Sequence, residues 1–198
     1  MFPDTDSKRC AILKATLELV AERGFHDTPM SQVAKRSGAS PGVIYHYFAS
    51  KDELIRDLYK QVKTVKARAM LQGDFDDVPP KEAFKRSWRN AYDFYRTHRL
   101  EARFLEQYEN SPYHCPTDLQ ELAREDQNFA VLARRLGLVD GGSPFKPLPA
   151  DIVHDLSFGV AARLARRAPG DSTEQAPLDD ATLDDIAEGC WRAVARNP

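Results

Sequence analysis

The chain has 198 residues, 42% of them hydrophobic and 29% charged, a composition that excludes an intrinsically disordered chain and supplies a core. Its apolar stretches are far shorter than the roughly 20 residues of a transmembrane helix, and residues 1–9 lack the apolar run of a signal peptide, so we expect a cytoplasmic protein without a membrane span. The net charge of −2 divides into +2 for residues 1–51, from seven Lys/Arg against five Asp/Glu, and −4 for the remainder, a gradient that fits nucleic-acid binding only weakly.

The pattern of apolar residues is helical almost throughout. They recur at three- and four-residue spacing, and no alternating β-branched run appears, so we expect an all-α fold of about nine helices. The first helix should span residues 6–23 with Ile12 and Val20 on its apolar face, and Gly24 should end it. Phe25 can then fold back on Val20.

Two short helices are expected next. One follows Thr28 as its N-cap, with Pro29 at its first helical position, and ends at Gly38. The other is capped by Ser40 and runs only to about Tyr47.

A long helix is expected over residues 51–72. Ser50 and Glu53 form a capping box, in which each side chain satisfies the free backbone amide of the other residue. Leu54 and Leu58 then mark the apolar stripe of this helix.

The main break in the chain is expected at residues 73–80, an acidic run that ends in two prolines and cannot continue a helix. This break predicts a three-helix head over residues 1–51 and a larger helical body over residues 73–198, connected by the long helix.

Large aromatic residues mark three successive stripes of the body. Ligand sites are mostly apolar with a few placed polar groups, so we expect these rings to line a pocket for an apolar or aromatic effector. For any single ring, ordinary core packing is the simpler alternative. The expected pocket residues are Trp88, Tyr92, Tyr95, Phe104, Tyr108 and Phe129.

Two late helices, separated by loops rich in Gly and Pro, each carry a clear apolar stripe. Such stripes are typical of a two-fold interface in which each pairs with its copy in a four-helix arrangement. The alternative is that they only close the core of their own chain. The expected interface residues are Ile152, Leu156, Val160, Leu164, Leu183, Ile186, Cys190 and Val194.

The two short helices of the head form a helix-turn-helix. Gly38 tolerates a positive φ, which lets the second helix cross the first steeply and place its N-terminal end in a major groove of DNA. Helix N-termini also attract phosphate, so the helix starts near Thr28, Ser40 and Lys51 are expected to clamp the DNA backbone.

The stretch of residues 24–54 resembles the TetR family of bacterial transcription regulators, over the N-terminal quarter to third of the chain. The resemblance implies a homodimeric, ligand-responsive DNA-binding regulator, whose heads occupy successive major grooves of a near-palindromic operator. It also implies a body that binds a small effector, and we expect a repressor that this effector releases. The matching residues are Gly24-Phe25, Val33-Ala34, Gly38-Ala39-Ser40, Ile44-Tyr45, Tyr47-Phe48 and Lys51.

The resemblance also assigns DNA contacts by position, while Ile44 and Phe48 should face inward. The expected contacts are Ser40, Pro41, Gly42 and Val43 to bases, and Tyr45, His46, Tyr47 and Lys51 mainly to phosphates. The sequence departs from the usual family pattern at Met30 and Val43, which often carry a hydroxyl in relatives, and at Pro41, which has no donor. We therefore expect recognition through thymine methyl groups and DNA shape more than through hydrogen bonds.

No catalytic, metal or cofactor site is indicated. The three cysteines are scattered without a Cys-x-x-Cys pair, and His114 beside Cys115 lacks a second ligand pair. Carboxylates such as Glu101, Glu106 and Glu109 are expected on solvated helix faces, and no nucleophile and base accompany them. The remaining alternatives are a helix-turn-helix DNA binder without an effector, with a filled body, and a small all-α enzyme, which would need a convergent polar site.

Overall fold

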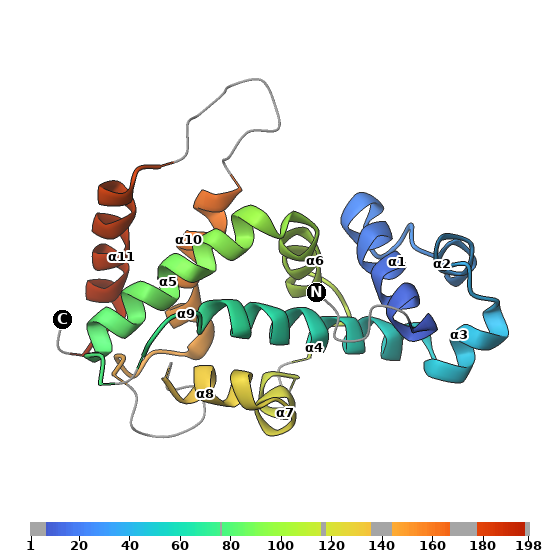
Figure 1. The fold of residues 1–198 in the computed structure, drawn as a ribbon, viewed down its shortest axis with the longest axis horizontal. Helices are drawn as coiled ribbons and strands as arrows, with labels where there is room; N and C mark the ends of the chain where they lie inside the picture. Colours follow the sequence, from blue (N-terminus) through green and yellow to red (C-terminus); the bar gives the residue numbers. More distant parts are fainter. Residues whose placement is uncertain (1–6, 76, 116–117, 136–143, 167–177, 197–198) are drawn as a thin grey trace. The chain divides into compact units, whose positions relative to one another are not determined.

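The structure is a computed structural model that describes residues 7–75, 77–115, 118–135, 144–166 and 178–196 (Figure 1). These residues form eleven helices and no strand, which confirms the all-α prediction. The helices are α1 (Lys8–Arg23), α2 (Met30–Ser37), α3 (Pro41–Tyr47), α4 (Lys51–Met70), α5 (Pro80–Thr97), α6 (Arg99–Glu109), α7 (Asp118–Glu125), α8 (Gln127–Arg135), α9 (Ala150–Asp155), α10 (Phe158–Ala165) and α11 (Asp180–Val194).

Two breaks raise the number of helices above the nine expected. Between α7 and α8, the Asp126 carboxylate accepts the Phe129 backbone N–H at 2.7 Å, so it caps a new helix. Between α9 and α10, Ser157 adopts φ −131° and ψ −90°, which no helix accommodates. Each break divides an apolar stripe that is continuous in the sequence.

The described chain forms two compact units, and the first of them is discontinuous. It comprises residues 1–65 and 99–119, while residues 66–98 and 120–198 form the second. Helix α6 therefore belongs to the same unit as the helix-turn-helix, whereas the sequence pattern alone assigns residues 99–119 to the body.

The core of the first unit lies where α6 packs against α1. The buried side chains of α1 include Ile12, Leu13 and Leu17, and the Tyr108 ring of α6 stacks on Tyr59 of α4 with centroids 4.1 Å apart. The ring of Phe25, in the turn after α1, contacts Phe104 and Tyr108 of α6.

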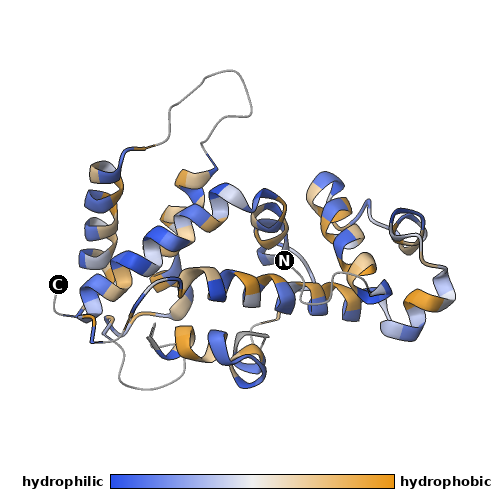
Figure 2. Cartoon of the chain, viewed as in Figure 1, coloured by the Kyte–Doolittle hydropathy of each residue, from blue (hydrophilic) through white to orange (hydrophobic). Residues whose placement is uncertain are grey.

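The second unit is built around α5, which packs against α10 and α11. Phe84 of α5 contacts Phe158 of α10 and Trp191 of α11, at centroid distances of 5.5 and 5.4 Å. Along these helices hydrophilic and hydrophobic residues follow one another within short stretches of the ribbon (Figure 2). None of the described helices is both long enough and apolar enough to cross a membrane.

Candidate nucleic-acid interface

The turn between α2 and α3 has the geometry that the sequence predicts. Gly38 lies in the left-handed region with φ 68° and ψ 12°, and Ser40 caps α3 by accepting the Val43 N–H at 3.4 Å. Pro41 follows at the first helical position, where its missing N–H is of no consequence. This arrangement fixes the start of α3 without any help from a ligand.

The start of α2 differs from the prediction. Pro29, not Thr28, occupies the N-cap position, and the Thr28 hydroxyl donates to the Gly24 carbonyl at 2.7 Å. The Thr28 side chain is buried as a result. Thr28 therefore closes the turn after α1, and the prediction that it contacts DNA is wrong, because a buried hydroxyl that already donates within its own chain cannot reach a phosphate.

Helix α3 divides its side chains between the core and the solvent, as its sequence predicts. Ile44 and Phe48, the residue that follows the helix, are both buried. Tyr45 is 54% exposed and Tyr47 39% exposed, and His46 is exposed between them. The exposed face of α3 is therefore aromatic and polar, and two inward anchors hold it in place.

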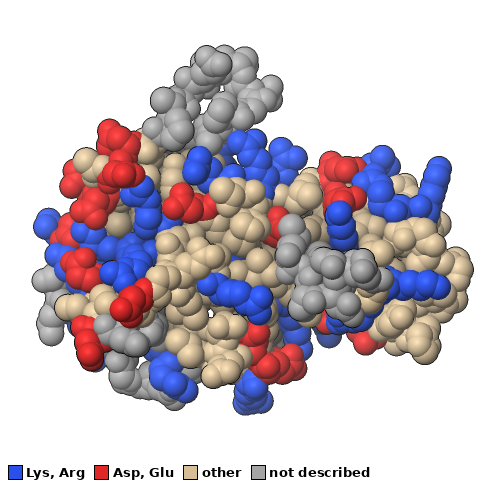
Figure 3. All heavy atoms as spheres, viewed as in Figure 1, with Lys and Arg blue, Asp and Glu red and all other residues tan. Residues whose placement is uncertain are grey.

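The N-terminal end of α3 is exposed and carries no charge. Ser40, Pro41 and Gly42 are exposed, Val43 is half-buried, and α3 contains no Lys, Arg, Asp or Glu. The surface around α3 is largely uncharged in the view of Figure 3, with Lys and Arg at its margin. Such a surface suits contact with base edges, while cations beside it suit phosphates.

Gly42 has no structural need to be glycine. Its φ is not positive, and a Cβ built on it would meet no atom within 4 Å. Gly24 and Gly38, by contrast, have φ of 85° and 68°, which other residues rarely adopt. Gly73, with φ of 97°, is a third position of this kind, whereas neither the backbone nor the packing of the described residues requires glycine at position 42.

Lys51 begins α4 and bonds to the chain itself. Its Nζ donates to the carbonyl of Phe25 at 2.8 Å, which ties the start of α4 to the turn after α1. Burial lowers the pKa of Lys51, against a smaller opposing effect of Asp52. The expected capping box is present in a shifted form, because Glu53 accepts the N–H of Ala49 and not that of Ser50.

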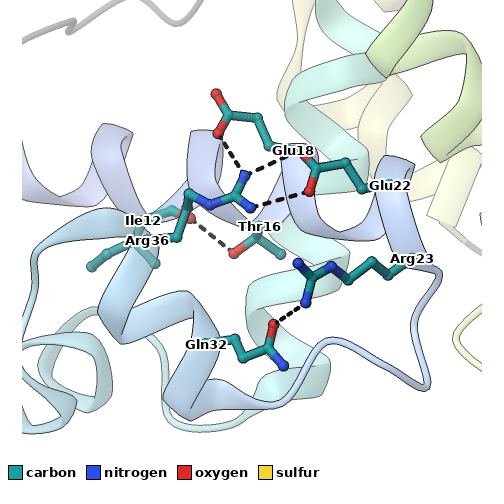
Figure 4. A network of polar contacts seen from close by, with 7 residues as sticks. All are labelled: Ile12, Thr16, Glu18, Glu22, Arg23, Gln32 and Arg36. Atoms are coloured by element: carbon teal, nitrogen blue, oxygen red, sulfur yellow. Dashed lines mark hydrogen bonds and ion pairs between the residues drawn. The ribbon is translucent and has the colours of Figure 1, made fainter.

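An ion network fixes α2 on α1 (Figure 4). Arg36 donates to Glu22 through two bonds of 3.1 Å and to Glu18 at 3.3 Å, and Arg23 donates to Gln32 at 3.0 Å. The hydrogen bond from Arg36 lowers the pKa of Glu22. Two carboxylates of the head are thereby engaged with one guanidinium.

Comparisons with known proteins agree with this geometry. Residues 12–58 match the domain described as bacterial regulatory proteins, tetR family, and residues 79–195 match the tetracyclin repressor-like C-terminal domain, which spans more than half of the chain. The chain belongs to the TetR family. It is thus a helix-turn-helix transcriptional regulator with a ligand-binding C-terminal domain.

Relatives of this TetR-family chain align over most of its length. An uncharacterized HTH-type transcriptional regulator from Haemophilus influenzae is 28% identical over 191 residues, which is 93% of this chain and 94% of the relative. The regulator BetI from Yersinia pestis is 30% identical over 160 residues, which is 68% of this chain and 78% of BetI. A TetR-family regulator from Marinobacter aquaeolei has a similar solved structure, with a TM-score of 0.77, 25% identity, and coverage of 98% of this chain and 99% of that one.

The six aromatic residues predicted to line one pocket are all buried, but they do not share one unit of this TetR-family chain. Phe104 and Tyr108 pack in the first unit against Phe25 and Tyr59. The other four belong to the second unit, where the Trp88 and Tyr92 rings stack at 6.3 Å. Those four are Trp88, Tyr92, Tyr95 and Phe129, all buried.

The residues predicted to form a dimer interface divide into three groups by their exposure. Leu183, Cys190 and Val194 of α11 are buried within the single chain, which favours for them the alternative that they close its own core. Ile152 and Leu156 are 40% and 43% exposed. The remaining three, Val160, Leu164 and Ile186, are half-buried.

Two features of the first unit were missed by sequence reasoning. The rings of Tyr113 and Phe25 are in contact, with centroids 5.2 Å apart, so the segment after α6 also reaches the turn after α1. Glu101, expected on a solvated face, is buried. The sequence does indicate this burial, because Glu101 lies three residues before Phe104 and seven before Tyr108, a spacing that places all three on one helix face.

Among the residues that the structure describes, no group of three or more His, Cys, Asp or Glu is placed to hold a metal ion.

Proposed function

We propose that the protein is a homodimeric repressor in the cytoplasm that binds a near-palindromic operator through α3 and leaves it when a small molecule binds. The observation that carries this proposal is the exposed face of α3, where Tyr45 and Tyr47 face solvent while Ile44 and Phe48 anchor the helix. Large aromatics on a monomer surface usually mark a binding site, and their polar tips suit phosphate oxygens.

Bases are read in this proposal by the N-terminal end of α3. Ser40 offers a hydroxyl, Pro41 and Val43 offer apolar contact to a thymine methyl, and Gly42 allows the backbone to come close to the groove floor. Direct hydrogen bonds to bases are few with these residues. Specificity then depends partly on the shape of the operator.

Phosphates are held by Tyr45, His46, Tyr47 and Lys51. The bond from Lys51 to Phe25 uses one of the three donors of the ammonium, so two can serve a phosphate. Contacts of this kind position the head in the groove and carry little sequence information.

The dimer is proposed to form through apolar side chains that follow residue 149. Ile152 on α9 and Leu156, which follows it, are exposed, and the half-buried Val160 and Leu164 lie on α10. In a two-fold interface the same surface of each subunit packs against its copy, so these side chains of one protomer would contact the same side chains of the other.

The test is selection of bound duplexes from a random pool, followed by footprinting on DNA upstream of the protein's own coding region. We expect two related half-sites protected about one helical turn apart or a multiple of it. Recovery of no preferred duplex, or of one with a single half-site bound by a monomer, would contradict the proposal.

Paired variants separate the roles of the α3 residues. Tyr45→Phe and Tyr47→Phe remove only hydroxyls and should weaken binding to all duplexes about equally, because phosphates are the same in every sequence. Val43→Thr should change the preferred base at one position of each half-site. A changed preference in the tyrosine variants, or none in Val43→Thr, would reverse these assignments.

A further inference from the structure

A buried carboxylate in the first unit has an oxygen without a partner. Glu101, in the first turn of α6, is only 2% exposed. No donor among the described residues forms a hydrogen bond with its Oε1 atom. Burial of an unpaired carboxylate oxygen is strongly unfavourable, so a group of this kind points to a bound donor.

Glu101 lies in the first turn of α6, which is the positive end of the helix dipole. The dipole does not meet the directional requirement of Oε1, because a carboxylate oxygen accepts hydrogen bonds along its lone pairs. The missing group is therefore a hydrogen-bond donor, and a donor with positive charge suits it best.

Aromatic rings lie on the same buried face of α6. Phe104 and Tyr108 follow Glu101 by three and seven residues, a spacing that places all three side chains along one face. Tyr108 stacks on Tyr59, and Phe104 contacts Phe25. Ring faces attract cations and provide apolar contact for a carbon substituent.

We propose that this face of α6 recognises a protonated amine with an apolar substituent, whose N–H group donates to Oε1 of Glu101, and that such an amine is the effector. Its role as effector rests on the proposed function, while its binding to Glu101 does not. A water molecule on Oε1 would supply the hydrogen bond but neither the charge nor the apolar contact.

The contacts of α6 connect this site to the helix-turn-helix. Helix α6 packs against α1, and the ring of Phe25 contacts both Phe104 and Tyr108, at 5.7 and 6.4 Å. The carbonyl of Phe25 accepts the bond from Lys51 at the start of α4. Displacement of Phe104 or Tyr108 by a ligand would therefore act directly on the turn that precedes α2 and on the proposed phosphate contact of Lys51.

The binding test uses the full chain and matched probes in the absence of DNA. A panel of amines from methylamine and butylamine to benzylamine and 2-phenylethylamine is compared by calorimetry and by thermal melting. Each amine is paired with its alcohol, which lacks the charge, and with its trimethylammonium analogue, which lacks the N–H donor. We expect at least one amine to bind about ten- to a hundred-fold more tightly than both of its analogues. Failure of every amine to bind, or equal binding of an amine and its alcohol, would overturn the proposed site.

Glu101→Gln tests the carboxylate itself. The variant should lose about ten-fold or more of the amine affinity, and Glu109→Gln, an exposed position on the same helix, should lose none. Equal binding by wild type and Glu101→Gln would overturn the assignment. If Glu101→Gln fails to fold, the contrast among amine, alcohol and trimethylammonium probes in the wild-type chain still decides the question.

The effector role is tested by operator affinity with and without the amine. We expect a decrease of about five-fold or more in the presence of saturating amine. An amine that binds to Glu101 without changing operator affinity would overturn the effector role. A chain that bound no DNA would instead refute the proposed function, and amine binding would remain measurable.

Discussion

Gly42→Ala should stabilise the protein and weaken its binding to the operator. A Cβ at Gly42 meets nothing within 4 Å, and the backbone φ is one that alanine adopts. Alanine is favoured over glycine in a helix by about 0.5–1 kcal/mol. For a chain of this size, that corresponds to a rise in melting temperature of about 1 to 4 °C.

The same methyl group should reduce operator affinity, because it would stand between α3 and the base edges. Loss of one good base contact costs about 1–3 kcal/mol, so we expect affinity to fall about ten- to a hundred-fold. The affinity is measured by fluorescence anisotropy on a selected duplex, and stability by thermal melting of the same samples. The two measurements are expected to move in opposite directions.

Gly189→Ala is the matched control. Gly189 lies on α11, is exposed, and also has open space where a Cβ would stand. It should raise the melting temperature in the same way and leave operator affinity unchanged. Unchanged or increased affinity in Gly42→Ala would show that this glycine does not lie against DNA, and would refute the docking of α3 that we propose.

Four further predictions follow from the same contacts. Lys51→Ala should weaken binding to all duplexes and reduce the salt slope by about one per head, and a salt slope equal to that of wild type would exclude a phosphate contact. Phe48→Ala should lower the free energy of unfolding by about 3–5 kcal/mol in urea titration, because the ring is buried, and a loss under 1 kcal/mol would contradict its role as an anchor. Leu156→Glu should give a monomer at micromolar concentration in sedimentation velocity, whereas a persisting dimer would place the interface elsewhere. Arg36 lowers the pKa of Glu22 in the folded chain. The Glu22–Arg36 pair therefore stabilises the fold fully above the pKa that Glu22 has in the unfolded chain, and this stabilisation is lost as the pH falls through the lower pKa of the folded chain. Arg36→Met should remove that part of the acid dependence in thermal melts between about pH 3 and 5.

Local features of the helix-turn-helix could be predicted from the sequence because neighbours in the chain determine them. The spacing of Ile44 and Phe48 put both on one face of α3, and Gly38 was the residue that the turn required. The N-cap of α2 is Pro29 and not Thr28, because cap geometry depends on backbone angles and Pro29 holds the extended conformation of that position.

Contacts between distant segments could not be predicted in the same way. Phe104 and Tyr108 have the same periodic signal as Trp88 and Tyr92, yet they pack in a different unit. The spacing of Glu101 places it on an apolar helix face, whereas its residue type predicts exposure, since carboxylates are rarely buried. In the structure it is buried. Periodicity identifies the buried face of a helix and does not identify the partner of that face.

The discontinuous first unit has a consequence for how the chain is made. Residues 1–65 cannot complete their core until α6, at residues 99–109, has left the ribosome, because α6 covers α1. The N-terminal helices are therefore synthesised well before their packing partner, which raises the contact order of the unit and should slow its folding. A regulator assembled by exchanging heads between relatives would need to carry α6 together with the helix-turn-helix, although more than thirty residues separate them in the sequence.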